Sequence, residues 1–320
     1  MDLEPEELQF LSITDIVKES ITIPRTSPRT FSLLTLTLIF PLSFAILVHS
    51  LFTHPLVKQL NNTSPSSAAA QHSWTLLLIY QFIYILFLFA FSLLSTAAVV
   101  FTVASIYTSK PVSFSNTLSA IPSVLKRLFV TFLYTTLLMV VYDIAILIAL
   151  VVLIVAIDTQ SGLLFLFSAI AIIVLFLFVH VYITALWHLA SVISVLEPVY
   201  GFEAMKKSRE LLKGKTRMAF VIVFVYLMMC GSIGGVFGTV VVHGGEDYGI
   251  LVRVCVGGFC VGVLVLVNLI GLMVQSVFYY VCKSYHHQQI DKSALYDHLG
   301  GYLGEYVPLK SSVQMESLEI

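Results

Sequence analysis

Long apolar runs separated by short polar segments make up most of this chain. Six of the runs reach the length of about 20 residues that a helix needs to cross the hydrocarbon core of a bilayer. Several exceed 25 residues, so we expect those helices to tilt or to project beyond the bilayer. The alternative, long helices buried in a soluble core, would need a polar shell that this chain has too few polar residues to build. The predicted spans are residues 31–52, 75–107, 128–157, 162–195, 218–242 and 250–282.

The composition also indicates a membrane protein. The chain is 58% hydrophobic and only 11% charged, whereas about 25% of a soluble domain is charged. We therefore expect an all-α polytopic membrane domain over residues 31–282, flanked by an N-terminal segment (1–30) and a C-terminal tail (283–320). Because the N-terminal segment is polar and acidic, we expect no cleaved signal peptide.

The basic residues predict the orientation in the membrane. All Lys and Arg residues except Lys58 and Arg253 fall in the N-terminal segment, in the loops after spans two and four, or in the tail. Because basic residues in short loops are retained in the cytosol, we expect both termini to be cytosolic. The opposite side would carry the loop 53–74, whose sequence "NNTS" makes Asn61 and Asn62 candidate glycosylation sites.

The most basic of these loops, residues 197–217, has the spacing of a short helix. Small and apolar side chains fall on one half of the helical wheel and charged ones on much of the other. Pro198 separates the segment from span four, Gly214 is a plausible C-cap, and Glu203 and Lys207 form an i,i+4 pair. We expect a helix on the cytosolic membrane surface, a plain charged connector being the alternative. The bases of both cytosolic loops that we expect to meet anionic headgroups are Lys126, Arg127, Lys206, Lys207, Arg209, Lys213, Lys215 and Arg217.

A second segment parallels this one. Residues 104–132 and 190–220 both run from a span through Ala-Ser, a charged residue, Pro-Val and a Phe into a helical segment that ends in bases. Because both loops are expected in the cytosol, they predict a parallel repeat of spans two–three and four–five, with an interfacial helix in each loop. Chance similarity between apolar segments is the alternative.

The segment "EPVYGFEAMKKSRELLKG" resembles the signature of a polytopic superfamily. That superfamily includes the bacterial membrane domain fused to glycerophosphodiester phosphodiesterase catalytic domains. From "EPEELQFLSITDIVKESI" through "PLSFAILVHSLFTHPL" to "LGGYLGEYVPLK", the chain resembles plant six-span proteins whose inherited label is polyadenylate-binding-protein-binding. The resemblance implies a small endomembrane protein without catalytic activity, since the phosphodiesterase domain is not seen here. The matching positions are Glu197, Ala204, Ser208, Leu211 and Gly214.

Polar side chains inside the spans are the candidates for chemistry. Asp143 lies at the centre of span three, where a carboxylate is costly and typical of a functional site. At about 1.5 Å of rise per residue, His180 in span four lies at a similar depth and is the best partner for Asp143. Structural hydrogen bonding, proton or ion handling, and contact with water or lipid at a cavity stay open for Asp143. We expect His188, Asn268 and Gln275 to form hydrogen bonds between helices.

Small residues recur at spacings of four in spans five and six. Such spacing lets helix backbones approach closely. We expect these residues to pack span five against span six, a contact between two copies of the chain being the alternative. The glycines are Gly231, Gly234, Gly235, Gly238, Gly258 and Gly262.

Motifs of catalysis are not seen in the sequence. We find no nucleophile elbow, zinc-binding HExxH, phosphate-binding glycine loop or dinucleotide fingerprint, and we expect no enzyme, cofactor or metal site. We favour a scaffold or adaptor of the endoplasmic reticulum or another secretory-pathway membrane, the plasma membrane included, that presents its basic loops to anionic headgroups or a cytosolic protein. The alternative is a transporter or channel for a small solute, ion or proton that uses Asp143 and His180. No nucleic-acid partner is expected, and a homo-oligomer stays open.

Overall fold

The computed structural model describes residues 8–62, 68–108, 113–156, 162–245 and 247–288. These residues form helices and no strand. Six stretches are long and apolar enough to cross a membrane, which confirms the prediction of an all-α polytopic membrane protein. The spans are Pro28–Asn62, Ala70–Tyr107, Val124–Val155, Phe165–Leu196, Thr216–Val242 and Ile250–Tyr285.

The helices extend further than the apolar runs that predict them. Residues 53–62, predicted to be part of a loop, continue the first span, because backbone hydrogen bonds carry a helix past the apolar stretch. Asn61 and Asn62 are the exposed last residues of that helix, while Thr63 and Ser64 of their sequons lie outside the described residues. Most of the tail (289–320) also lies outside them. The helices are α1 (Ile13–Thr26), α2 (Pro28–Leu34), α3 (Phe40–Asn62), α4 (Ala68–Tyr107), α5 (Phe114–Ala156), α6 (Gly162–Leu196), α7 (Phe202–Leu212), α8 (Thr216–Val236) and α9 (Ile250–Tyr285).

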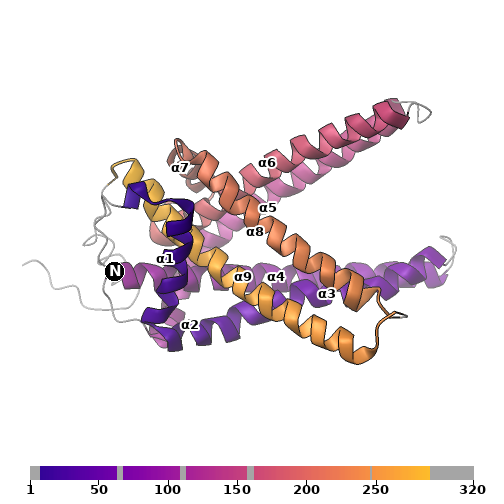
Figure 1. The fold of residues 1–320 in the computed structure, drawn as a ribbon, viewed down its shortest axis with the longest axis horizontal. Helices are drawn as coiled ribbons and strands as arrows, with labels where there is room; N and C mark the ends of the chain where they lie inside the picture. The colour runs from indigo at the N-terminus through magenta and orange to yellow at the C-terminus, as the bar shows by residue number, and fades with distance from the viewer. Residues whose placement is uncertain (1–7, 63–67, 109–112, 157–161, 246, 289–320) are drawn as a thin grey trace, which may run out of the picture.

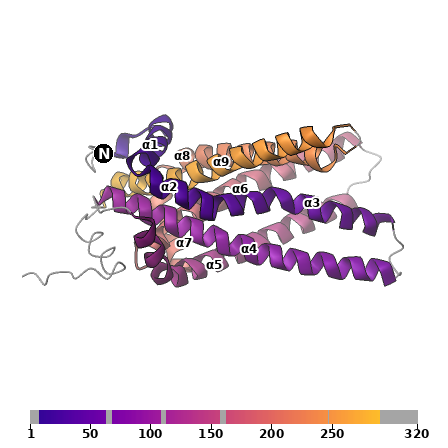
Figure 2. The ribbon, with the colours of Figure 1, turned by 90° about the horizontal axis from the view of Figure 1, so that it is seen from below.

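Consecutive spans pack as pairs, α3 with α4, α5 with α6, and α8 with α9. The pairs converge at the end that holds α1 and α7 and diverge toward the other end, where α5 and α6 run away from the rest (Figure 1). Figure 2 shows α1 and α7 again at this shared end. Burial follows the same division, because the continuous buried stretches lie near the shared end of their helices. These stretches are residues 97–105, 189–197 and 276–282.

The N-terminal segment is part of this core. Ser12 caps α1 by accepting a hydrogen bond from the backbone N–H of Asp15 at 3.3 Å, and the Asp15 carboxylate accepts one from the Ser12 N–H. Ile16 and Ile23, two turns apart on one face, are fully buried because α1 packs against α9. The polar segment that precedes span one is therefore docked onto span six.

The two loops that resemble each other in sequence have different structures. Residues 114–127 are the first turns of α5 and form no separate helix, so an interfacial helix before span three is not present; residues 109–112 lie outside the described part. By contrast, α7 is a separate helix, since Gly201 (φ +63°) precedes it and Gly214 (φ +84°) follows it. These left-handed conformations favour glycine, and the first loop has no glycine at all.

The six glycines predicted to pack span five against span six do not lie in that contact. Outside its own helical turns, a Cβ atom added to any of Gly231, Gly234, Gly235, Gly238, Gly258 and Gly262 would meet no atom of the described residues within 4 Å. The close approach occurs at Gly257 and Gly271, where an added Cβ would lie 3.6 Å from Phe237 and 3.0 Å from Tyr226. Consecutive residues are about 100° apart around a helix, so Gly258 points well away from this contact. A contact between copies of the chain through the exposed glycines stays a prediction.

Candidate functional site

A cavity of about 320 Å³, lined by both apolar and polar side chains, lies between the membrane-spanning helices. Side chains from α3, α4, α5, α6, α8 and α9 line it, so every span contributes. It brings together all of the intramembrane polar residues that the sequence singles out, which are Asp143, His180, His188, Asn268 and Gln275. These five residues come from three different helices, α5, α6 and α9, and are up to 132 positions apart in the sequence, yet they share one site.

Asp143 and His180 face the same cavity but are not bonded to each other. Within the described part of the chain, Asp143 makes no hydrogen bond and no ion pair. The His180 ring lies 5.7 Å from the ring of Tyr142, whose hydroxyl donates to the Phe176 carbonyl oxygen at 2.5 Å. The two residues line one cavity, but the predicted pair is not formed. The Asp143 carboxylate is therefore exposed and unbonded at the cavity.

Asn268 forms the interhelical hydrogen bonds expected of it. Its amide nitrogen donates to the Ser43 hydroxyl at 2.9 Å, and its carbonyl oxygen accepts from the Tyr226 hydroxyl at 2.9 Å. Asn268 thus links α9 to both α3 and α8 on one wall of the cavity. His188 and Gln275 form no hydrogen bond within the described chain, so the expectation is wrong for these two residues; the His188 ring instead contacts the Tyr226 ring edge-on, with centroids 5.7 Å apart. Gln275 lines the same wall.

Two buried hydroxyl groups in the cavity wall have no partner. Ser95 and Thr184 are 1% and 4% exposed, and neither hydroxyl oxygen forms a hydrogen bond with any residue that the structure describes. Hydroxyl side chains in helices usually donate to the carbonyl oxygen four residues earlier, as Ser191 does to Trp187 at 2.8 Å. A buried hydroxyl without a partner costs about 1–3 kcal/mol. Both oxygen atoms are covered by neighbouring atoms, so a molecule in the cavity would bond to them only after a shift of the side chains around them.

The sequence does not single out these two hydroxyls. Ser and Thr occur often in the spans, and most bond within their own helix, so residue type alone carries no signal. Only packing determines which of them lack a partner. Tyr226 is missed for the same reason, because aromatic residues are common throughout these spans.

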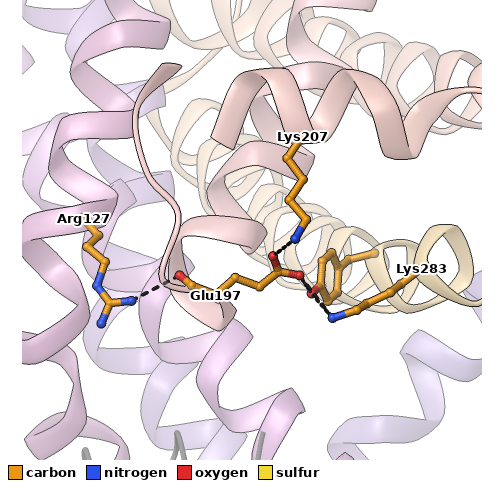
Figure 3. Close-up of polar contacts among 5 residues, drawn as sticks. Arg127, Glu197, Lys207 and Lys283 are labelled. Carbon is orange, nitrogen blue, oxygen red and sulfur yellow. Dashed lines mark hydrogen bonds and ion pairs between the residues drawn. The ribbon is translucent and has the colours of Figure 1, made fainter. Parts of the chain in front are cut away.

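A second polar cluster, at the end that holds α7, is built around Glu197. Its carboxylate accepts hydrogen bonds from Lys207, from the Tyr279 hydroxyl at 2.5 Å and from the Lys283 ammonium at 3.2 Å (Figure 3). Its backbone carbonyl oxygen accepts from Arg127 at 3.2 Å. The end of α6 is therefore tied to α5, α7 and α9 through one residue.

The charge of Glu197 is stabilised by these contacts. Burial on its own raises the pKa of Glu197, but the hydrogen bonds from Lys207 and Tyr279 and the charge of Lys283 outweigh it. The pKa of Glu197 therefore lies below its ordinary value of 4.5. Every polar atom of the carboxylate is occupied, so this cluster has a structural character.

The turn between Glu197 and α7 is held in place by hydrogen bonds to Thr131 on α5. The Gly201 N–H donates to the Thr131 hydroxyl at 2.8 Å, and Thr131 also bonds the Ser194 hydroxyl at 2.7 Å. Ser208 of α7 donates to the Leu186 carbonyl oxygen at 2.9 Å. The segment "EPVYGFEAMKKSRELLKG" therefore forms the bonds that hold α7 against α5 and α6. The sequence marks Glu197, Ser208 and Gly214 as motif positions but not what they contact.

The bases predicted to bind headgroups fall into two groups. Arg127 and Lys207 bind Glu197, and Lys215 donates to the Gln9 carbonyl oxygen at 2.8 Å, with its ammonium 5.0 Å from the Tyr285 ring. These three bases therefore make contacts within the chain, and the buried side of α7 packs on α6. The remaining bases are exposed at the end that holds α7: Lys126, Lys206, Arg209, Lys213 and Arg217.

Comparison with known proteins places the chain in a family but gives it no described activity. Neither the curated proteins nor the solved structures contain a match to it. A match to the family described as "Domain of unknown function (DUF8558)" spans residues 1–318 and therefore covers the spans, the cavity and the Glu197 cluster. The protein belongs to the DUF8558 family.

Proposed function

We propose that this membrane domain binds a small polar solute in the cavity between its spans and carries it across the bilayer. The observation that supports this function best is the convergence of polar groups on one intramembrane cavity. Polar side chains inside a membrane are costly and usually face a pathway or a binding site. Here they come from several helices, and Asp143, Ser95 and Thr184 lack partners within the described chain.

The volume and position of the cavity fit such a role. About 320 Å³ lies in the range of about 300–1,000 Å³ that is typical of small-molecule sites. Sites of membrane transporters commonly lie near the bilayer midplane between helix pairs that can rock against each other. The divergence of α5 and α6 from the remaining spans supplies pairs of that kind. We propose a binding protein rather than an enzyme.

Solute uptake by proteoliposomes tests this function. Purified full-length protein would be reconstituted, and uptake of protons, sodium, choline, urea and glycerol would be compared with protein-free liposomes. We expect uptake of at least one of these solutes, and at least a tenfold reduction by Asp143→Asn or Thr184→Val. Asp247→Asn, the same change in an exposed loop, is the matched control and should leave uptake unchanged.

The same assay can reject the proposal. Uptake no faster than through protein-free liposomes for the whole panel would argue against transport. Uptake that survives both cavity substitutions would place the pathway elsewhere. Each variant would first be checked for a single symmetrical peak in size-exclusion chromatography, so that loss of uptake is not loss of folding.

A role for the exposed bases is the second candidate. Lys206, Arg209, Lys213 and Arg217 form an exposed basic face beside α7, which supports the scaffold or adaptor function in an endomembrane and a cytosolic placement of this end. Changing these four to Gln should abolish any preferential stabilisation of the protein by anionic over zwitterionic lipid nanodiscs. Lys58→Gln at the opposite end is the control. Equal stability in both lipids before mutation would argue against headgroup binding.

A further inference from the structure

The charged side chains that line the cavity have one sign. Among the described residues, its lining includes one acidic residue, Asp143, and no Lys or Arg. The basic residues of the described chain lie toward the ends of the spans, with Arg253 bound to the Val241 carbonyl oxygen at 2.6 Å. The two imidazoles in the lining, His180 and His188, form no hydrogen bond with Asp143. An anion would therefore meet a carboxylate and no fixed counter-charge, whereas a cation would meet its complement.

Aromatic rings form much of the wall. Phe132, Trp187 and Tyr226 line the cavity, and the rings of Phe132 and Trp187 are packed edge to face at 5.4 Å. The face of an aromatic ring attracts a cation, Trp most strongly, and quaternary ammonium groups are the ligands that such walls recognise. Close packing around the rings holds them in place, so little order has to be gained on binding.

A small inorganic cation fits this lining less well. Ca²⁺ takes six to eight oxygen ligands, usually with several carboxylates, and Mg²⁺ requires a regular octahedron. The described chain has no group of three or more His, Cys, Asp or Glu side chains that could hold a metal ion. One carboxylate beside aromatic faces instead suits a bulky monovalent cation that is weakly hydrated.

The hydroxyl groups without partners indicate a polar end on the same molecule. Ser95 lies on α4 and Thr184 on α6, both buried in the wall of the cavity. From this combination we infer that the cavity recognises a small organic monocation, an ammonium compound that also carries a hydroxyl or a similar polar group. This inference rests on the proposed function and adds the charge and class of the solute.

Choline and its neutral isostere test the inference directly. Equilibrium binding of radiolabelled choline to the full-length protein in nanodiscs would be measured, with 3,3-dimethylbutan-1-ol as the competitor. The two molecules have the same shape, but the competitor has carbon in place of the charged nitrogen. We expect the competitor to bind at least tenfold more weakly. Asp143→Asn should weaken choline binding at least tenfold, Asp247→Asn should not change it, and Trp187→Leu should weaken it roughly threefold or more.

Three results would overturn the inference. They are equal binding of choline and its isostere, choline binding that survives Asp143→Asn, and no choline binding to the wild-type protein. If Asp143→Asn fails to fold, the comparison of the two ligands on the wild-type protein still decides. The proposed function is judged separately, because uptake of urea or glycerol that depends on Thr184 would uphold a polar pathway even when choline does not bind.

Discussion

The Glu197 cluster and the cavity are both polar, but they differ in how their polar groups are satisfied. Around Glu197, the carboxylate and the backbone carbonyl group are bonded to side chains from α5, α7 and α9. In the cavity, Asp143 has no bonded partner in the described chain, and the hydroxyls of Ser95 and Thr184 have none either. The Glu197 cluster holds helices together, whereas the cavity contains polar groups that the fold does not use and that could bind a ligand.

This difference separates two roles that the sequence alone cannot tell apart. A fully bonded buried network makes the structure rigid, while a buried polar group left without a partner lowers stability. Such groups call for an explanation, and a ligand is one. Substitutions should therefore affect the free energy of unfolding differently in the two regions. Those around Glu197 should lower it, whereas those in the cavity should keep or slightly raise it but remove binding.

Glu197→Gln should have the largest effect on stability. It leaves Lys207 and Lys283 without their counter-charge, and breaking a largely buried ion pair costs about 3 kcal/mol. Denaturation in mixed micelles would measure the free energy of unfolding, with Glu203→Gln on the exposed face of α7 as the control. A loss no greater than that of the control would remove the structural role given to the cluster.

Gly201→Ala should have the next largest effect on stability. The residue has φ +63° and ψ −132°, a conformation open almost only to glycine, and an added Cβ would lie 3.3 Å from Val130. We expect a loss of about 2 kcal/mol in the free energy of unfolding. Gly234→Ala, at a helical position where an added Cβ meets nothing, should instead leave stability unchanged or raise it by up to about 1 kcal/mol. Similar values for the two variants would contradict the strain at Gly201.

Acid should weaken the Glu197 cluster selectively. Because the folded-state pKa of Glu197 lies below 4.5, its contribution is present above that value and is lost as the pH falls through the folded-state pKa. Each unit of difference between the two states is worth about 1.4 kcal/mol. The stability gap between wild type and Glu197→Gln, measured from pH 7 to pH 3, should therefore narrow below pH 4.5. A gap that is constant over this range would show that the charge of Glu197 is not involved.

Thr184→Val should have the smallest effect on stability and the opposite sign. The change keeps the shape and removes a buried hydroxyl without a partner, so we expect a gain of between zero and about 1 kcal/mol in the free energy of unfolding. Solute uptake should fall at the same time. Ser194→Ala, which removes the 2.7 Å bond to Thr131, should lose about 1 kcal/mol and serves as the contrast. A clear loss of stability in Thr184→Val would mean that its hydroxyl supports the fold.

The sequence predicts some parts of the site well and others badly. Asp143 and His180 are identified because an ionisable residue within a long apolar run stands out, and helical rise relates their depths. Their expected pairing is wrong because depth says nothing about which way a side chain points around the helix. The glycine pairs fail for the same reason, since a small-residue face can point toward a partner helix or away from it.

Local properties of the sequence determine the class of this protein. Apolar runs fix the six spans and the helical content, since a chain in a bilayer must satisfy its backbone hydrogen bonds internally. The basic loops predict the orientation, and Gly201 and Gly214 separate α7 from its neighbours. Tertiary structure alone decides that α1 docks on α9, that Glu197 gathers Lys207, Tyr279 and Lys283, and that the polar residues share one cavity. These are contacts between distant segments, and they depend on how the helices are rotated and packed, which no local pattern encodes.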